Sequence, residues 1–218
     1  MAGCTEAIKP LTSDRSVANM RAMQRGDEAR LALIDAAMRE ASRIGVAALT
    51  LAPVAERAGW SKSGLLRHFP TKEALQLAVV RRTTELFRER VLLPALSAPA
   101  GLPRLRVIFR NWLGWISNSG LDGGCPLNGA RLEFDDQPGE VRDALVVGWN
   151  EWLAYLERQA TKAVDLKQVT TPLTPRQIVM AVAGLASAAD SMTRLLGQRD
   201  AVRDAERAFD QLFSPTSH

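Results

Sequence analysis

Residues 50–75, with the sequence TLAPVAERAGWSKSGLLRHFPTKEAL, contain the start and stop signals of two short helices and the start of a third. Thr50 is placed to cap the first helix, and Gly59 to end it in the left-handed conformation that glycine adopts readily. Ser61 is a candidate cap for the second helix, which Pro70 ends because proline disfavours a helical conformation in the residue before it. Two short helices joined by a glycine turn predict a helix-turn-helix, whose second helix enters the major groove of DNA.

The charge of this stretch agrees with that interpretation. Every charged side chain between residues 57 and 72 is basic, namely Arg57, Lys62, Arg67 and Lys72. A surface of one sign fits the dense line of phosphates on a duplex. On charge alone, a solvated basic face is an equal alternative.

The same stretch resembles the N-terminal DNA-binding domain of the TetR family of transcriptional regulators, over roughly residues 27–80. The matching residues are Thr50, Val54, Ala55, Ala58, Gly59, Ser61, Lys62, Gly64, Leu65, His68, Phe69, Lys72, Glu73, Ala74 and Leu75. The family usually has a tyrosine just before the His-Phe pair, and it typically touches a DNA phosphate. This chain has Leu66 and Arg67 there, so Arg67 is expected to replace it with a charge-assisted bond or to read a base.

The resemblance implies a set of DNA-binding residues and their roles. Thr50, Arg67 and Lys72 are expected to anchor phosphates, Lys62 and Ser63 to face base edges, Ser61 to cap the reading helix, Gly64 to allow a close approach, and His68 to contact a phosphate or fix the helix end. The expected partner is double-stranded DNA with a near-palindromic operator, because a two-fold dimer presents two helix-turn-helix domains. We call the helix-turn-helix domain of each copy its reading head.

Composition sets wider bounds on the class of protein. The chain has 218 residues, of which 46% are hydrophobic and 24% charged, and a formal net charge of +4. Two cysteines are too few for a disulfide framework, and no apolar run is long enough to span a membrane, so a cytoplasmic protein is expected. With no phosphate-cradling glycine loop, no metal-ligand spacing and only two histidines, neither catalysis, a cofactor nor a metal is expected.

Helical periodicity without sustained strand patterns predicts an all-α fold in three parts. These are a flexible N-terminal arm over 1–26, a three-helix helix-turn-helix domain over 27–75, and a larger helical effector-binding and dimerisation domain over 76–218. Asp27 is the expected cap of the first helix. Pro94 is expected to stop the helix that begins after Thr71, with a connector over 94–103. Later helices are expected from 103 to 116, 140 to 165, 175 to 196 and 200 to 213.

Four of the five tryptophans lie in this second domain as two pairs, each spaced by three residues and so on one helix face. On the residues alone, core packing is the favoured explanation. The resemblance implies a pocket for a small-molecule effector of unknown identity. Its candidate residues are Phe109, Trp112, Trp115, Cys125, Trp149 and Trp152.

Cys125 carries an alternative hypothesis. It follows Gly123 and Gly124 and precedes Pro126, where a helix N-terminus would lower the pKa of its thiol. Some TetR-like regulators sense oxidants or electrophiles with a cysteine in a comparable Gly-Cys loop, so a thiol-based sensing repressor is possible. The other interpretation is a buried, inert cysteine.

The helix after Pro175 is rich in small residues, which suit a tight helix–helix contact. The resemblance implies that the last two helices form a homodimer interface, with candidates Ile178, Val182, Leu185, Ala189, Met192 and Phe209. The expected function is a sequence-specific DNA-binding regulator, most often a repressor in this family, released from its operator by the effector. A helical protein that binds DNA without sequence preference is the alternative from another class.

Overall fold

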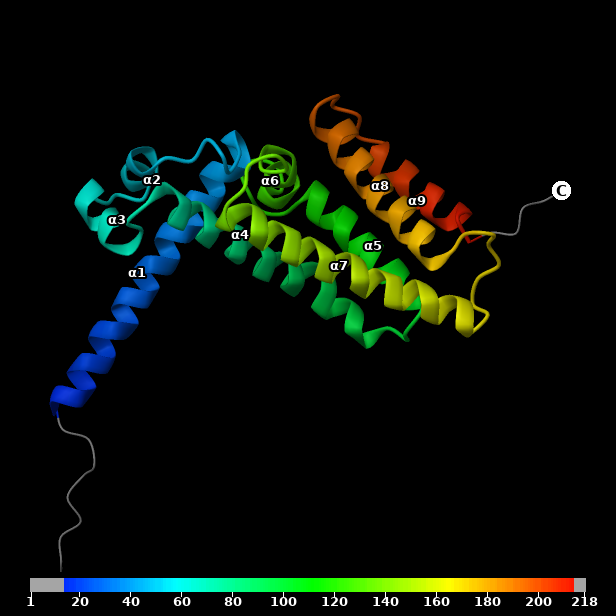
Figure 1. The fold of residues 1–218 in the computed structure, drawn as a ribbon, viewed down its shortest axis with the longest axis horizontal. Helices are drawn as coiled ribbons and strands as arrows, with labels where there is room; N and C mark the ends of the chain where they lie inside the picture. The colour runs from blue at the N-terminus through cyan, green and yellow to red at the C-terminus, as the bar shows by residue number, and fades with distance from the viewer. Residues whose placement is uncertain (1–13, 214–218) are drawn as a thin grey trace, which may run out of the picture.

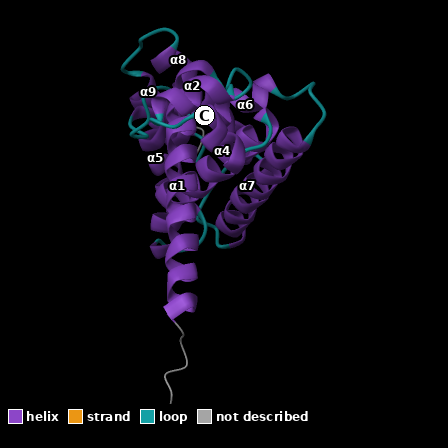
Figure 2. Cartoon of the chain, turned by 90° about the vertical axis from the view of Figure 1, so that its left-hand side faces the viewer, coloured by secondary structure: helices purple, strands orange, loops and turns teal. Residues whose placement is uncertain are grey.

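The computed structural model describes residues 14–213, and every regular element within that range is helical (Figure 2). The all-α prediction is therefore confirmed. The elements are α1 (Asp14–Ile44), α2 (Leu51–Arg57), α3 (Lys62–His68), α4 (Lys72–Phe87), η1 (Arg88–Leu92), η2 (Leu93–Ser97), α5 (Leu102–Ser117), α6 (Pro126–Glu133), α7 (Glu140–Asp165), α8 (Pro175–Arg194) and α9 (Ala201–Gln211). Figure 1 shows α1–α3 at one end and α8 and α9 at the other, with α4 and α6 between them.

The helix-turn-helix rests on a compact apolar core. Leu33 of α1, Val54 of α2 and Leu65 of α3 are each at most 1% exposed, and they share one buried cluster with the first half of α4. The same cluster includes Phe134 after α6 and Val141 on α7. Because one core joins these elements, the N-terminal helices pack directly against the second domain.

The first helix is longer than the sequence predicted. It begins at Asp14, so Asp27 lies inside it and does not cap it, and the expectation of an irregular arm over residues 14–26 is wrong. Residues 14–26 contain no proline, and the single glycine, Gly26, costs a helix only about 1 kcal/mol relative to alanine. The rest of the predicted arm, residues 1–13, lies outside the described residues.

The helix α4 connects the two parts of the molecule. It packs against α1 and against α7. Its α-helical hydrogen bonding ends at Phe87, and the chain continues through the π-helical turn η1 and the 3-10 turn η2. Pro94 lies in η2, where its missing N–H rules out a continuing α-helix.

The C-terminal core brings α5 and α9 together. The rings of Phe109 and Phe209 stack nearly parallel, at a centroid distance of 4.5 Å, and both side chains are 1% exposed. The start of α8 is well defined, because Thr174 and Gln177 form a reciprocal capping box. The expected helix start at Thr174 and Pro175 is confirmed.

The burial of α8 and α9 corrects part of the predicted dimer interface. Four of its six candidates, Ile178, Val182, Ala189 and Phe209, are at most 1% exposed and face the core of their own chain. Leu185 is half-buried, and Met192 is 37% exposed. A helical period identifies an apolar face but does not say whether that face meets the same chain or a second copy. One exposed face of α8 instead carries Met180, Gly184, Ala188 and Met192, and Leu195 follows the helix.

We predict that Phe209→Ala lowers the free energy of unfolding by about 3–5 kcal/mol, because it removes a fully buried ring and the stacking contact of that ring with Phe109. Urea denaturation at one fixed protein concentration measures the change. Val147→Ala is the control, since a side chain on α7 that is 57% exposed contributes little to stability. Equal midpoints for Phe209→Ala and the unmodified protein would contradict the assigned core.

Candidate nucleic-acid interface and ligand cavity

The helix α3 presents its polar face outward, because Leu65 and the following Phe69 are fully buried. Ser61 caps the helix, as predicted: its Oγ accepts a hydrogen bond from the backbone N–H of Gly64 at 3.1 Å. The preceding turn contains Gly59 at a φ of +70°, in the left-handed region. These two local features produce the helix-turn-helix geometry.

The predicted DNA-binding residues fall into two groups. Those that are exposed are Thr50, Ser61, Lys62, Ser63, Arg67 and Lys72. Gly64 and His68 are half-buried beside Trp60 instead. A Cβ on Gly64 would lie 3.2 Å from the indole, and the His68 ring meets it edge-on at a centroid distance of 5.5 Å. Gly64 and His68 therefore fix the position of α3.

The two threonines at helix starts behave differently. Thr50 precedes α2, but its hydroxyl makes no capping hydrogen bond, so that part of the prediction is wrong. Thr71 does cap α4, since its Oγ1 accepts from the N–H of Ala74 at 3.0 Å. Lys72 follows at the first position of this 16-residue helix. An ammonium group beside free helix N–H groups favours the binding of an anion such as phosphate.

The basic residues of the stretch are not equivalent. Arg57 donates to Glu40 of α1 at 2.7 Å, so its charge is used within the protein. Lys62, Arg67 and Lys72 have no ion-pair partner among residues 14–213 and are exposed. These three side chains form the available cationic surface.

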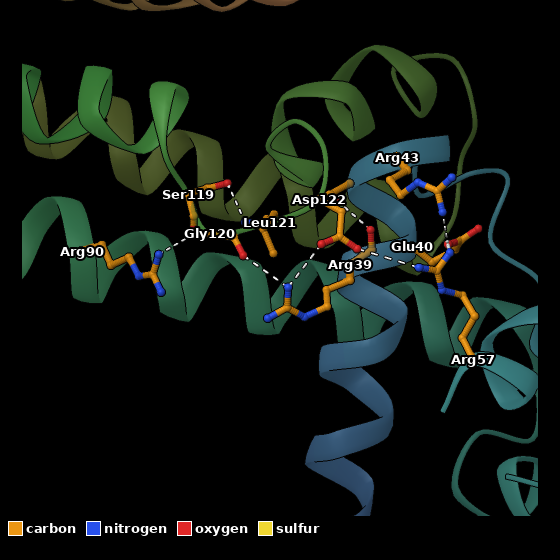
Figure 3. Close-up of polar contacts among 10 residues, drawn as sticks. Arg39, Glu40, Arg43, Arg57, Arg90, Ser119, Gly120, Leu121 and Asp122 are labelled. Atoms are coloured by element: carbon orange, nitrogen blue, oxygen red, sulfur yellow. Dashed lines mark hydrogen bonds and ion pairs between the residues drawn. The ribbon is translucent and has the colours of Figure 1, made fainter. Parts of the chain in front are cut away.

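A network of charged side chains joins α1 and α2 to the loop between α5 and α6 (Figure 3). Arg57 bonds to Glu40 and lies 3.8 Å from Asp122. Arg39 lies 3.4 Å from the other oxygen of Asp122 and donates to the carbonyl of Gly120, also at 3.4 Å. We call Arg39, Glu40, Arg57 and Asp122 the junction network. Sequence reasoning missed it, because the partners in it are far apart along the chain.

Backbone hydrogen bonds reinforce the same junction. The N–H of Gly124 donates to the carbonyl of Ser42 at 2.8 Å, and a Cβ on the neighbouring Gly123 would collide with that carbonyl. At the other end of α6, the carboxylate of Glu133 accepts from the N–H of Ala47 at 2.8 Å. Both ends of the segment 123–133 are therefore attached to the last turn of α1 and the turn that follows it.

The second domain encloses a cavity of about 490 Å³ among α4, α5, α6, α7 and α8. Four of the six predicted pocket residues line it: Trp112, Cys125, Trp149 and Trp152. Phe109 and Trp115 do not. Phe109 faces α9, and Trp115 packs against Phe87 with the guanidinium of Arg90 5.6 Å from its ring centroid. The three-residue spacing predicted that Trp112 and Trp115 share one face of α5. That face is wide, so Trp112 lines the cavity while Trp115 packs against Phe87 and Arg90 outside it.

Sequence reasoning missed the polar groups of the cavity wall. Arg131 of α6 donates to the Oδ1 of Asn128, whose Nδ2 donates to the Oδ2 of Asp190 on α8. The guanidinium of Arg131 also lies over the ring of Trp149, 3.6 Å from its centroid. Burial lowers the pKa of Arg131 because it desolvates the cation. Asn128 and Asp190 are 62 residues apart, so no local pattern predicts the pair.

Cys125 precedes α6 and lines the cavity, which confirms its expected place at a helix start. The expected lowering of its pKa is wrong. Burial raises the pKa of the thiol, and this outweighs the opposite effects of the nearby Trp115 indole and of the backbone N–H groups of Asn128 and Leu127. The Trp115 N–H makes no hydrogen bond of normal geometry, so its influence on the sulfur is weak.

Between residues 14 and 213 no helix combines the length and apolar character needed to cross a membrane. Within the same range, no group of three or more histidine, cysteine, aspartate or glutamate side chains is arranged to hold a metal ion.

Comparison with known families gives two matches. Residues 33–79 match the family model described as bacterial regulatory proteins, tetR family. Residues 101–209 match the model described as the tetracyclin repressor-like C-terminal domain. The resemblance drawn from residues 50–75 is thereby confirmed, and it extends over the second domain. None of the curated proteins compared with the chain matches it.

Solved structures with the same fold include three of interest. A TetR transcriptional regulator from Chloroflexus aurantiacus J-10-FL has a TM-score of 0.78 at 19% identity, covering 86% of this chain and 95% of its own. AibR, solved with isovaleryl coenzyme A and operator DNA, has a TM-score of 0.71 at 19% identity, with coverages of 85% and 98%. The reduced form of NemR from E. coli has a TM-score of 0.73 at 18% identity, with coverages of 87% and 100%.

We predict that Cys125 reacts with iodoacetamide at pH 8 more slowly than glutathione does. A raised pKa leaves less of the reactive thiolate at that pH. Mass spectrometry of the Cys4→Ser variant follows Cys125 alone, and the same protein in urea, where the protection is lost, is the control. Alkylation of the folded protein that is faster than that of glutathione would support thiol sensing and contradict the inert assignment.

Proposed function

The chain belongs to the TetR family of transcriptional regulators, and we propose that it is a homodimeric, sequence-specific DNA-binding repressor released from its operator by a small-molecule effector. The observation that carries this proposal is the capped helix α3, whose exposed face offers Lys62 and Arg67 without internal ion pairs. The AibR complex, with operator DNA and a ligand, supports the same two classes of partner here. We expect a non-enzymatic protein that acts in the cytoplasm.

The proposed DNA contacts follow from exposure and charge. Lys62 and Ser63 lie in the first turn of α3 and are assigned to base edges. Arg67 lies one turn further and is assigned to a phosphate or a base. Thr50 and Lys72 stand at the starts of α2 and α4, where a free hydroxyl and an ammonium suit the phosphates on either side of the groove.

The proposed route of regulation runs through α6. Its cavity side contributes Asn128 and Arg131, while Glu133 in its last turn holds the N–H of Ala47 next to the reading head. A ligand that binds Asn128 or Arg131 and displaces them therefore acts on the same short helix that positions α1 and α2. The ligand shifts the equilibrium between two positions of the reading head only by the difference between its affinities for the two states.

The proposed homodimer uses the outer face of α8. Met180, Gly184, Ala188 and Met192 repeat every four residues on this exposed face, and Leu195, which is 83% exposed, extends it. Small residues at its centre permit close approach of the same helix from a second copy. Exposed apolar side chains at both ends would then be buried in the dimer.

We predict that Arg67→Ala and Lys72→Ala each weaken operator binding about tenfold and reduce the slope of log affinity against log salt by about 1. Fluorescence anisotropy over a range of salt concentrations, with an operator duplex identified by selection, measures both quantities. Arg207→Ala, which removes an exposed arginine from α9, is the matched control and is expected to change neither. Unchanged affinity and slope in both head variants would refute the assigned contacts.

We predict that Ala188→Arg converts the dimer to a monomer without loss of helical structure, because a buried, unpaired charge is costly at a dimer interface. Light scattering coupled to size-exclusion chromatography gives the mass, and circular dichroism checks the fold. Thr161→Arg, at an exposed position on α7, serves as the control. A dimer that persists in Ala188→Arg at micromolar concentration would place the interface elsewhere.

A further inference from the structure

The walls of the cavity are aromatic on one side. Phe87, Trp112 and Trp152 meet edge-to-face, with centroid distances of 5.0 Å between Phe87 and Trp152 and 5.4 Å between the two indoles. Trp149 continues this surface, 6.2 Å from Trp112. Rings from α4, α5 and α7 thus surround a space of about 490 Å³, within the range of pockets for small organic molecules. A flat aromatic ligand fits such walls, because aromatic rings prefer offset or edge contacts.

The part of the cavity wall formed by α6 and α8 carries a fixed polar chain, Arg131–Asn128–Asp190. Arginine can only donate and an ionised aspartate can only accept, so these partners fix the orientation of the Asn128 amide between them. The amide uses one oxygen of Asp190. The other, Oδ1, is buried and has no hydrogen-bond partner within the described structure. An unpartnered buried carboxylate oxygen is costly, and a donor on a ligand would remove that cost.

The hydrogen-bond donors of Arg131 are also incompletely used. It makes no ion pair with any residue between 14 and 213, and one face of its guanidinium is covered by Trp149. Its edge keeps further N–H donors, whose planar arrangement matches a carboxylate. Trp152, which also lines the cavity, has a buried Nε1 with no hydrogen-bond partner among residues 14–213 and adds another donor.

The charge of the cavity favours an anion over a cation. Its charged lining residues are three arginines, Arg88, Arg131 and Arg158, against two carboxylates, Glu151 and Asp190. Arg88, Arg158 and Glu151 are exposed, whereas Arg131 and Asp190 are half-buried. A ligand that carries one negative charge and one neutral donor would complement both inner groups.

We propose that the cavity binds a planar aromatic hydroxy acid, with its carboxylate on Arg131, its hydroxyl donating to Oδ1 of Asp190 and its rings against Trp112 and Trp149. This assignment rests on the proposed function, because it names the ligand class of the effector site. The two polar groups must be separated on the ring, since Arg131 and Asp190 bind opposite ends of one amide. A hydroxyl meta to the carboxylate meets this requirement, whereas an ortho hydroxyl donates to its own carboxylate.

Isothermal titration calorimetry of the full-length protein with naphthalene derivatives tests the assignment. We expect 4-hydroxy-2-naphthoate to bind at least about tenfold more tightly than 2-naphthoate, 1-naphthol or the ortho isomer 3-hydroxy-2-naphthoate, since each of these lacks one charge-assisted contact. The cation 2-naphthylmethylammonium is expected to bind most weakly. Equal affinities across the series, tightest binding of the cation, or no binding by any member would overturn the assignment.

Two variants separate the contacts. Arg131→Gln is expected to weaken both 2-naphthoate and 4-hydroxy-2-naphthoate about tenfold while leaving 1-naphthol unchanged. Asp190→Asn is expected to abolish the advantage of 4-hydroxy-2-naphthoate over 2-naphthoate. Operator binding by the unmodified protein is measured in parallel. If the probes fail while specific operator binding persists, the ligand class alone is wrong; if operator specificity is absent, the proposed function fails.

Discussion

The hydrogen bond from the N–H of Ala47 to the carboxylate of Glu133 is the contact on which the rest of the architecture depends. It attaches the end of α6 to the turn that leads into the helix-turn-helix. Beside it, the side chain of Glu133 fills the space where a Cβ on Gly45 would lie, and Gly45 has a φ of +88° that glycine adopts without strain. The reading head can therefore move little without moving α6.

This attachment gives the cavity a mechanical connection to DNA recognition. The two pairs that Asp122 makes in the junction network, with Arg39 and Arg57, are exposed, and such pairs contribute little stability individually. Their role is to orient the elements that they join. Arg57 orients α2 against Glu40 of α1, and Asp122 anchors the loop that leads to α6. In the proposed dimer, a modest preference of a ligand for one position of α6 would be transmitted to both reading heads.

Local chemistry explains which features could be predicted from the sequence. Ser61, Gly59 and Thr71 act within a few residues of their own positions, so their roles were visible in the order of residues alone. Contacts across the fold were not visible. The helical period identified the apolar face of α8 that contains Val182, but it could not tell whether that face packs within the same chain or against a second copy. Likewise, the pocket tryptophans were found by type, but Arg131 and Asp190 meet only through tertiary packing.

The most direct test of the central claim is the selection of bound duplexes from a random pool by the unmodified protein, at physiological salt and with excess nonspecific competitor. A sequence-specific dimer is expected to enrich one near-palindromic sequence, with half-sites separated by about one turn of DNA, roughly 34–36 Å. A pool that remains random, with binding that falls steeply as salt rises, would contradict it. Such behaviour belongs to a helical protein that recognises only the phosphate backbone.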